Sequence, residues 1–318
     1  MKAAVLNIEH QPYKITIQDE PVPIPKGDEI LIHVMASCLC HADKQMISGS
    51  MERTLKKLQK RSNVVTGIEI SGIVESDGKR FKKGDHVIAA IDYLNGVHGH
   101  AEYTVIPEKY LGHKPTSWTH EQAASVTTGL LTAIEALEKQ GKIEEGYEVL
   151  IHGASGGVGV YAVQLAHHHN CHVTATTNEN NIDFVKSLGA DISVDYNSDF
   201  LRDRKFNLIF DAAGKLNFTA CQGALAPKGV FITTQPLRDL GGGLRAVFSA
   251  KKWAFLYVAH SGKNRMARLL QLAQHDLVNP VVDSIYDLDQ IDEAFEKYMT
   301  TSVHGRIVIR MPHYTGGI

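Results

Sequence analysis

Hydrophobic residues follow a different pattern in the first part of the chain than in the middle. Through the first hundred residues, short apolar segments of mixed exposure are separated by glycine, proline and aspartate, at residues 3–8, 13–17, 29–37, 64–75, 84–91 and 102–106. Pro21, Pro23 and Pro25 exclude a helix or a central strand between two of these segments, because alternate positions lack an amide donor. Short strands at such close spacing predict a small antiparallel barrel or sandwich.

From residue 119 onward, helical and extended patterns alternate. A helical region over 119–139 leads to an apolar run, a glycine turn and a second helix, followed by strands at 172–177, 192–195, 208–212 and 229–234 and a helix at 182–187. This alternation predicts a doubly wound parallel sheet. Helices at 266–275 and 289–299 precede a last strand at 305–309. The hydrophobic pattern of that strand resembles that of the first hundred residues, so we expect the chain to return to the first domain.

The fold class expected is therefore α/β, with a β-barrel domain and a doubly wound domain. We predict that residues 1–120, completed by 265–318, form the barrel domain and that residues 121–264 form the second domain. A chain of 318 residues exceeds what one hydrophobic core usually serves, which favours two domains over one.

The centre of the second domain is a glycine turn between a strand and a helix. The apolar run at 149–152 has no polar alternation, which is typical of a strand buried on both faces. Gly153, Gly156 and Gly159 follow at three-residue spacing and lead into a helical run. Glycine lets the backbone approach a pyrophosphate, and the helix N-terminus supplies free N–H donors. The alternative is a glycine turn that only packs the helix on the strand. We predict a nucleotide-binding turn made of Gly153, Ala154, Ser155, Gly156, Gly157, Val158 and Gly159.

Composition and charge exclude several partners and compartments. The net charge of −2 gives no reason to expect nucleic acid or an anionic membrane surface. The sequence has no apolar run of eighteen residues, and its first residues lack a signal-peptide pattern. Four scattered cysteines do not make a disulfide framework. We therefore expect a cytoplasmic protein with no membrane or nucleic-acid partner.

Seven short segments, in order along the chain, resemble landmarks of the medium-chain dehydrogenase/reductase superfamily, which includes the alcohol dehydrogenases. They lie at residues 67–74, 84–87, 101–103, 123–125, 131–133, 153–159 and 304–308. The resemblance implies a GroES-like catalytic domain, a Rossmann cofactor domain, and hydride transfer in a cleft between them. It also implies a homodimer.

The zinc ligands of that superfamily are incomplete in this chain. Cys40, His41 and Asp43 match its first zinc-ligand segment, but Ile68 occupies the position of the second ligand and cannot donate to a metal. The four-cysteine structural lobe is also missing, since no cysteine lies between Cys40 and Cys171. Glu69 as a substitute ligand, assisted by His98 or His100, is the alternative. We expect no metal, with Cys40 as a small residue lining the cleft, as in the zinc-independent quinone oxidoreductase branch.

Without a metal to stabilise an alkoxide, reversible alcohol oxidation is disfavoured. The remaining chemistry is hydride delivery from a reduced nicotinamide to an electrophilic small molecule, either a quinone or the β-carbon of an enone. Water or a cleft side chain would supply the proton, and the candidate catalytic residues are Tyr93, His41 and Asp43.

Cofactor choice depends on the end of the second Rossmann strand, where an NAD enzyme usually has an acid. Thr177 occupies that position, which favours NADPH over NADH, whereas Glu179 fits the NAD pattern. No arginine or lysine follows until Lys186. By resemblance, Tyr196 matches a tyrosine near the adenosine phosphate. The resemblance implies further cofactor contacts at Cys40, Thr128, Asn178, Ala213, Gly214, Thr234 and Arg306.

Two of these assignments leave alternatives open. Arg306 either reaches the cofactor phosphates or is an exposed strand arginine. Asp211 is either a catalytic acid or, by preference, a carboxylate that caps its loop. At the level of function, the alternatives are a nucleotide-binding redox sensor or structural protein without turnover, and a zinc-dependent alcohol dehydrogenase.

Overall fold

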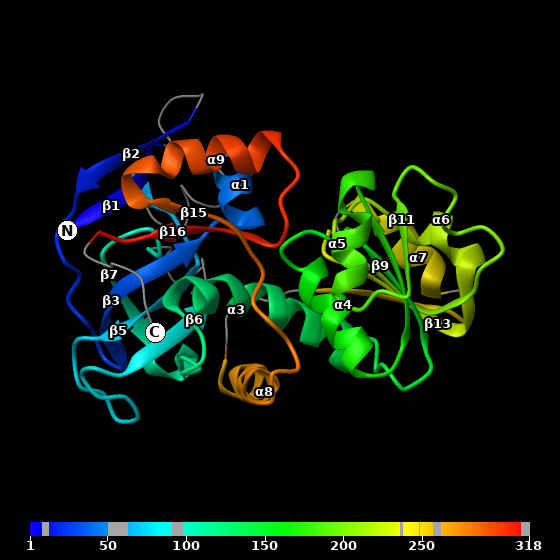
Figure 1. Ribbon diagram of the computed structural model, residues 1–318, viewed down its shortest axis with the longest axis horizontal. Coiled ribbons are helices and arrows are strands. Elements are labelled where there is room, and N and C mark those ends of the chain that lie inside the picture. The colour runs from blue at the N-terminus through cyan, green and yellow to red at the C-terminus, as the bar shows by residue number, and fades with distance from the viewer. Residues whose placement is uncertain are drawn as a thin grey trace. The chain divides into compact units, whose positions relative to one another are not determined.

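The computed structural model describes residues 1–7, 13–49, 63–90, 98–235, 238–247, 249–256 and 262–312 (Figure 1). The chain divides into two compact units. Unit 1 comprises Met1–Thr128, Ala259–Gln271 and Pro280–Ile318, and unit 2 comprises Gly129–Val258 and Leu272–Asn279. The first division falls inside a helix, after Thr128, whereas the sequence-based boundary was placed at residue 120.

Unit 1 contains two mainly antiparallel sheets. The smaller has the order β2-β1-β4, with β1 (Lys2–Asn7), β2 (Lys14–Asp19) and β4 (Asn63–Val65). The larger has the order β15-β16-β3-β5-β6-β8, and β7 also pairs with β3. Its strands are β3 (Glu29–Cys38), β5 (Glu69–Val74), β6 (His86–Ala90), β7 (Tyr103–Pro107), β8 (Gly112–His113), β15 (Val282–Asp287) and β16 (Arg306–Arg310).

The last described strand completes this larger sheet. β16 pairs with β3 in antiparallel register, with Val308 opposite Cys38, and with β15 in parallel register. After unit 2, the chain thus adds its last described strand to the sheet of unit 1. Ile32, Val34 and Ile70 on the sheet pack with Ile291 and Ala294 of a covering helix to form the main core of the unit. The helices that lie in unit 1 wholly or in part are α1 (His41–Ile47), α3 (His120–Ile134), α8 (Lys263–Gln274) and α9 (Ile291–Thr300).

Unit 2 is built on a six-stranded sheet in which every neighbouring pair is parallel, with the order β11-β10-β9-β12-β13-β14. This is the strand order of a Rossmann fold. Its strands are β9 (Glu148–His152), β10 (His172–Thr177), β11 (Ile192–Asp195), β12 (Phe206–Asp211), β13 (Leu225–Thr233) and β14 (Lys252–Phe255). Val149, Leu150 and Ile151 of β9 are fully buried, which explains why this strand has no polar alternation.

Helices cover the parallel sheet as the alternating pattern predicted. α4 (Gly159–His168) contacts β9 and β10, and α5 (Ile182–Ser187) contacts β11. α6 (Phe218–Cys221) contacts β13, and α7 (Leu240–Val247) contacts β14. The predicted α/β class, with a GroES-like barrel and a doubly wound domain, is confirmed.

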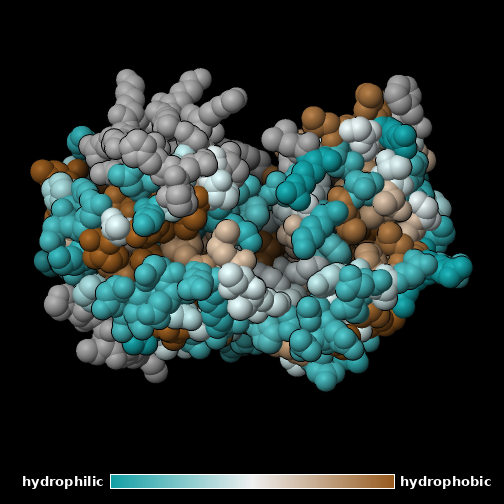
Figure 2. Space-filling view, turned by 90° about the horizontal axis from the view of Figure 1, so that it is seen from above, coloured by the Kyte–Doolittle hydropathy of each residue, from teal (hydrophilic) through white to brown (hydrophobic). Residues whose placement is uncertain are grey.

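Hydrophobic side chains also reach the surface in several places (Figure 2). Among the described residues, Ile24, Leu240, Leu244 and Val247 are more than 60% exposed. Within the described ranges, every helix is too short or too polar to cross a lipid bilayer.

Candidate active site and nucleotide-binding turn

The glycine turn follows β9 in unit 2, and two of its glycines are required by the backbone. Gly153 has a φ of +83°, in the left-handed region, and a Cβ there would lie 2.8 Å from the Cβ of Ala213. A Cβ on Gly159 would lie 2.2 Å from the carbonyl oxygen of Gly153. Close packing alone therefore explains why glycine occupies these two positions.

Gly156 does not fit that interpretation. A Cβ on this residue would meet only the Gly153 oxygen, at 3.5 Å, and would otherwise project into open space. Close packing therefore does not require glycine here, whereas the close approach of a ligand to the backbone would. The turn is open on the side of Gly156.

The helix that follows has no side-chain cap at its N-terminus, where α4 begins after Val158. The N–H groups of Val160 and Tyr161 donate to the carbonyl oxygens of Gly156 and Val158, at 3.1 and 3.2 Å, so these two are not available to a ligand. The first four N–H groups of a helix have no partner within it, and together with the helix dipole they attract an anion. An uncapped N-terminus beside the open turn is suited to hold phosphate oxygens.

Side chains join the turn to the end of β10. The Thr177 hydroxyl donates to Ser155 Oγ at 2.9 Å, and Asn181 Nδ2 donates to the same oxygen at 3.1 Å. The Asn178 side chain caps the next short helix by accepting from the Asn180 N–H at 3.0 Å. Asn181 was missed by the sequence analysis, because only the fold brings it to the turn.

The loop after β12 is fixed by Asp211, which is fully buried. Its carboxylate accepts from the N–H groups of Lys215 and Leu216 at 3.1 and 3.0 Å and from the Thr233 hydroxyl at 3.1 Å. Burial raises the pKa of Asp211, and these hydrogen bonds act against that rise. The preferred interpretation of Asp211 as a loop-capping carboxylate is therefore confirmed.

The same loop carries two of the residues predicted to contact the cofactor. Ala213 and Gly214 lie between Asp211 and Lys215, and Gly214 has a φ of +65°. The Thr234 N–H donates to the Asp211 carbonyl oxygen at 3.3 Å, which ties the ends of β12 and β13 together. Because the carboxyl ends of parallel strands meet at one edge of the sheet, these residues border the same edge as the glycine turn.

Unit 1 contains a buried ion pair between β5 and β16. Arg306 Nη2 lies 3.0 Å from Glu69 Oε1, and the two side chains are 5% and 0% exposed. Arg306 Nη1 also donates to the Leu39 carbonyl oxygen at 3.2 Å, and the Thr128 N–H donates to Glu69 Oε2 at 2.7 Å. Burial lowers the pKa of Arg306, but the Glu69 carboxylate, together with Cys38, Cys40 and Tyr298, outweighs burial and raises it. Arg306 is therefore a buried cation, and its interpretation as an exposed strand arginine is wrong.

Asp43 ties together the segments around the position of a superfamily zinc site. Its carboxylate is fully buried and accepts from the Cys40 N–H at 2.8 Å and from the Gly67 N–H at 3.1 Å. His100 Nε2 lies 3.8 Å from Asp43 Oδ1, and His100 Nδ1 lies 2.6 Å from Ser37 Oγ. Burial raises the pKa of Asp43, but His100 and the Cys40 N–H outweigh this and lower it. Asp43 thus organises the backbone of the site, and His41 is exposed at the start of α1.

The described residues near Cys40 do not fit a zinc ion. The Cys40 side chain is 3% exposed and belongs to an apolar cluster with Met46, Val64 and Ile68. Burial raises the pKa of its thiol well above the usual value, whereas zinc binds the thiolate. Glu69, the possible substitute ligand, is held by Arg306. Across the described residues, no three histidine, cysteine or carboxylate side chains converge as a metal site.

Three other residues were assigned to the site from the sequence, namely Thr128, Tyr196 and Tyr93. Thr128 donates its N–H to Glu69, as described above, and Tyr196 is 45% exposed at the end of β11. Tyr93, the first candidate for the proton donor, lies outside the described residues.

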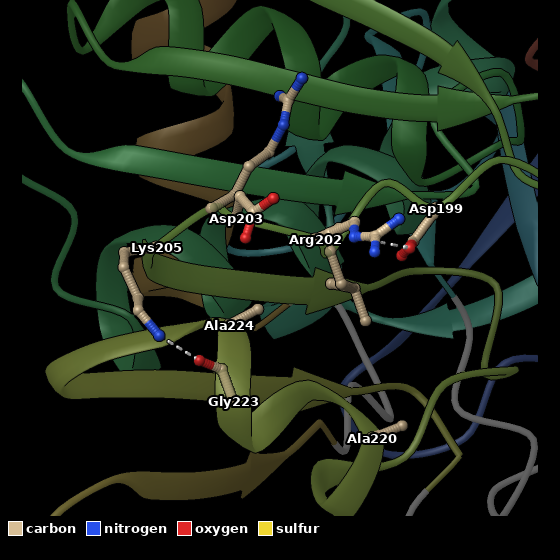
Figure 3. A pocket seen from close by; sticks show the side chains of 9 residues that line it. Asp199, Arg202, Asp203, Lys205, Ala220, Gly223 and Ala224 are labelled. Carbon is tan, nitrogen blue, oxygen red and sulfur yellow. Dashed lines mark hydrogen bonds and ion pairs between the residues drawn. The ribbon is translucent and has the colours of Figure 1, made fainter.

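A surface pocket of about 530 Å³ in unit 2 is separate from the glycine turn (Figure 3). In it, Arg202 Nε lies 3.9 Å from Asp199 Oδ2, and Lys205 donates to the Gly223 carbonyl oxygen at 2.5 Å. Lys205 immediately precedes β12, at the opposite end of the parallel strands from the turn. The pocket contains none of the predicted site residues, and it is lined by Asp199, Leu201, Arg202, Asp203, Arg204, Lys205, Ala220, Gly223 and Ala224.

Comparisons with known proteins agree with both units. Residues 26–116 match the family model described as alcohol dehydrogenase GroES-like domain, and residues 188–309 match the one described as zinc-binding dehydrogenase. The chain is 31% identical over 306 residues to quinone-oxidoreductase QR1, chloroplastic, of Triphysaria versicolor, covering 91% of this chain and 92% of that protein. It is 29% identical over 303 residues to NADPH-dependent alkenal/one oxidoreductase, chloroplastic, of Arabidopsis thaliana, covering 91% and 73%. The structure of the quinone oxidoreductase from Coxiella burnetii has a TM-score of 0.87, with 26% identity and coverage of 97% and 99%.

A GroES-like barrel joined to a Rossmann sheet with an open glycine turn defines the medium-chain dehydrogenase/reductase class. This chain belongs to the quinone oxidoreductase-like branch of that superfamily, and it is an oxidoreductase.

Proposed function

We propose that the protein uses NADPH to reduce a quinone or an enone by hydride transfer without a metal ion. The observation that carries this proposal is the open glycine turn with its uncapped helix, beside the loops that end β12 and β13. The names of the two relatives above, a quinone oxidoreductase and an alkenal/one oxidoreductase, support the acceptor class.

A bound NADPH would supply the hydride. The turn around Gly156 and the first N–H groups of α4 would hold the pyrophosphate, and the loop clamped by Asp211 would border the nicotinamide half. For an enone, the hydride goes to the β-carbon and a proton to the α-carbon, giving the saturated ketone and the oxidised cofactor. Tyr93 and His41 remain the proposed proton donors, with water as the alternative. Asp43 is no longer a candidate, because its lowered pKa leaves the carboxylate ionised and its oxygens accept the Cys40 and Gly67 N–H groups.

The proposal is metal-free because of the residues around Cys40. Ile68 offers no ligand atom, and it packs in the same apolar cluster as Cys40. Electrophilic acceptors do not need a Lewis acid, since the protein mainly has to hold the nicotinamide against them.

We also propose that the protein is a cytoplasmic homodimer. Among the described strands, β14 forms hydrogen bonds on one side only, with β13. Leu240, Leu244 and Val247 of the adjacent α7 are 64%, 68% and 75% exposed, and their spacing puts them on one face of the helix. An unpaired strand edge beside an exposed apolar stripe is typical of an interface.

The test fills the open side of the turn without disturbing the fold. In Gly156→Val, the new Cβ would meet only the Gly153 carbonyl oxygen, at 3.5 Å, and the side chain would occupy the space assigned to the pyrophosphate. Losing several charge-assisted hydrogen bonds should weaken NADPH binding by about a hundredfold or more. Calorimetric NADPH binding and NADPH oxidation at 340 nm, with 9,10-phenanthrenequinone and a panel of enones, provide the readouts.

Gly223→Val is the matched control, because a Cβ on Gly223 also meets nothing within 4 Å. Wild-type binding in Gly156→Val would contradict the proposal. NADPH binding by the wild type without turnover on any acceptor would favour the redox-sensor alternative, and one zinc per chain in the purified protein would refute the metal-free mechanism.

A further inference from the structure

The backbone of Lys215, which follows β12, is fixed by a hydrogen bond and by the turn before it. The Lys215 N–H donates to Asp211 Oδ1, and the preceding Gly214 makes a left-handed turn with a φ of +65°. Asp211 is fully buried and is also bonded to Thr233, so the base of this loop is anchored to two strands. The exposed Lys215 side chain therefore starts from a fixed point at the carboxyl edge of the sheet.

The side chain extends along this edge toward β11. Lys215 Nζ lies over the ring of Tyr196, 6.0 Å from its centroid. In the sheet order, β9 and β10 lie between the strands that precede these two residues. The ammonium group therefore crosses the edge where the nucleotide site is proposed. The pKa of His152, at the end of β9, is lowered to about 4, first by burial and then by the charge of Lys215.

Tyr196 lies at the part of the edge where a Rossmann domain would hold the adenosine ribose. Its N–H donates to the Thr177 carbonyl oxygen at 2.9 Å, which ties it to the end of β10. In Rossmann domains, the residue at this strand end recognises the ribose 2′-position, by an acid for NAD or by a nearby cation for NADP. Thr177 is neutral, and its hydroxyl is bonded to Ser155. The segment after β10 contributes the exposed Glu179 but no cation before Lys186.

We propose that Lys215, from the loop after β12, binds the 2′-phosphate of NADPH beside Tyr196 and so selects NADPH over NADH. The inference rests on the proposed nucleotide binding at the glycine turn and adds the cation that the sequence around β10 lacks. A lysine ammonium binds phosphate as a point charge, and its contact with an exposed tyrosine ring is weak enough to be exchanged for a phosphate.

The experiment measures how much the 2′-phosphate contributes to nucleotide binding, and it does not depend on catalytic turnover. Calorimetry compares the binding of 2′,5′-ADP with that of 5′-AMP, which lacks only the 2′-phosphate. In Lys215→Met, the preference for 2′,5′-ADP should fall by about tenfold or more, with 5′-AMP binding unchanged. Lys215→Arg should retain most of the preference. Lys186→Met removes the same charge from the exposed end of α5 and should leave the preference at the wild-type value.

A full 2′,5′-ADP preference in Lys215→Met would overturn the assignment, as would an equal loss in Lys186→Met, which would indicate only a general charge effect. Failure of the wild type to bind either nucleotide would instead refute the proposed function. NMR titration of His152 is an independent readout. Its pKa should rise in Lys215→Met, because a neighbouring positive charge is removed, and an unchanged pKa would show that Lys215 does not lie over this edge.

Discussion

At the scale of single residues, the buried pair of Glu69 and Arg306 is the feature with the largest energetic consequence. Both side chains are almost completely removed from water, and each also bonds to the backbone of another segment. A buried ion pair adds little stability over an apolar pair of the same shape, but removal of one partner leaves an uncompensated charge. The pair therefore specifies how β5, β16, α3 and the segment before α1 come together.

We predict that Arg306→Met destabilises unit 1 by about 3–5 kcal/mol, because the Glu69 carboxylate then lacks a counterion. The double variant Glu69→Gln, Arg306→Met should recover most of that loss. Urea unfolding followed by tryptophan fluorescence can report on this unit alone. The chain has two tryptophans, and in a Trp253→Phe background only the buried Trp118 of unit 1 remains.

A loss below about 1 kcal/mol in the single variant would show that water reaches the site and hydrates Glu69. Thr219→Ala, on the exposed surface of unit 2, is a suitable control and should leave the Trp118 transition unchanged.

Sequence reasoning at the residue scale succeeded where spacing along the chain carries the information. The glycine turn depends on the chain positions of Gly153, Gly156 and Gly159, so it could be recognised directly. Arg306 and Lys215 could not be assigned, because their partners lie in segments that only the fold brings near. No signal in the sequence around Arg306 distinguishes a buried strand arginine from an exposed one.

At the scale of elements, the start of α3 is joined to the barrel by a pair of histidines. His120 Nδ1 lies 2.8 Å from Ser71 Oγ, and His120 Nε2 lies 2.9 Å from His86 Nδ1. Burial lowers the pKa of His120 to about 3, with further lowering by the charges of Lys114 and His86. His120 is therefore neutral in the folded protein at all but strongly acidic pH.

This depressed pKa predicts an acid-dependent loss of stability. Unfolded histidine titrates near pH 6.5, so between about pH 6.5 and 3 the unfolded chain binds a proton at this residue and the folded chain does not. Stability should consequently fall with decreasing pH in this window, by about 1.4 kcal/mol per unit of pH for His120. Denaturant unfolding at a series of pH values measures the slope.

His120→Asn should flatten that slope by roughly the amount assigned to one histidine. His275→Asn, at an exposed position that follows α8, provides the control for the removal of a surface histidine. An unchanged slope in His120→Asn would contradict the prediction.

Elements were predicted where hydrophobic periodicity is strong and missed where it is weak. The parallel strands around β9 were found because their apolar positions are buried as the pattern requires, and the helix over Ile182–Ser187 was found although only Val185 in it is buried. α7 was missed because it contains three consecutive glycines, which have low helix propensity. β15 was missed because none of its residues is fully buried and its apolar positions are sparse.

At the scale of the whole molecule, the proposed dimer can be tested through the apolar stripe on α7. Leu244→Lys places a charge at the centre of the stripe, and burying that charge in an interface costs more than a weak dimer gains. We predict a dimer for the wild type and a monomer for Leu244→Lys by light scattering after gel filtration. Ile24→Lys, at a position 79% exposed in unit 1, should remain dimeric. A wild-type monomer, or a dimeric Leu244→Lys, would contradict this interface.

The division into units is harder to predict than the two fold types. α3 continues across the division after Thr128, and α8 is divided after Gln271. A continuous helix gives no composition shift or linker at which to place a boundary. The barrel and Rossmann folds could be predicted because each pattern extends over many residues. The points where the chain passes from one unit to the other depend on contacts made in three dimensions.

The chain position of β16 also has a consequence for biosynthesis. Arg306 and the Leu39 carbonyl oxygen that it binds are 267 positions apart, and β16 lies between β15 and β3 in the finished sheet. On a translating ribosome, β3 and the Glu69 carboxylate therefore emerge long before β16 and Arg306 exist, and by the time these are made Gly129–Val258 is already complete. We expect the nascent Rossmann unit to become native first, and the incomplete barrel to need protection by chaperones until its closing strand is released.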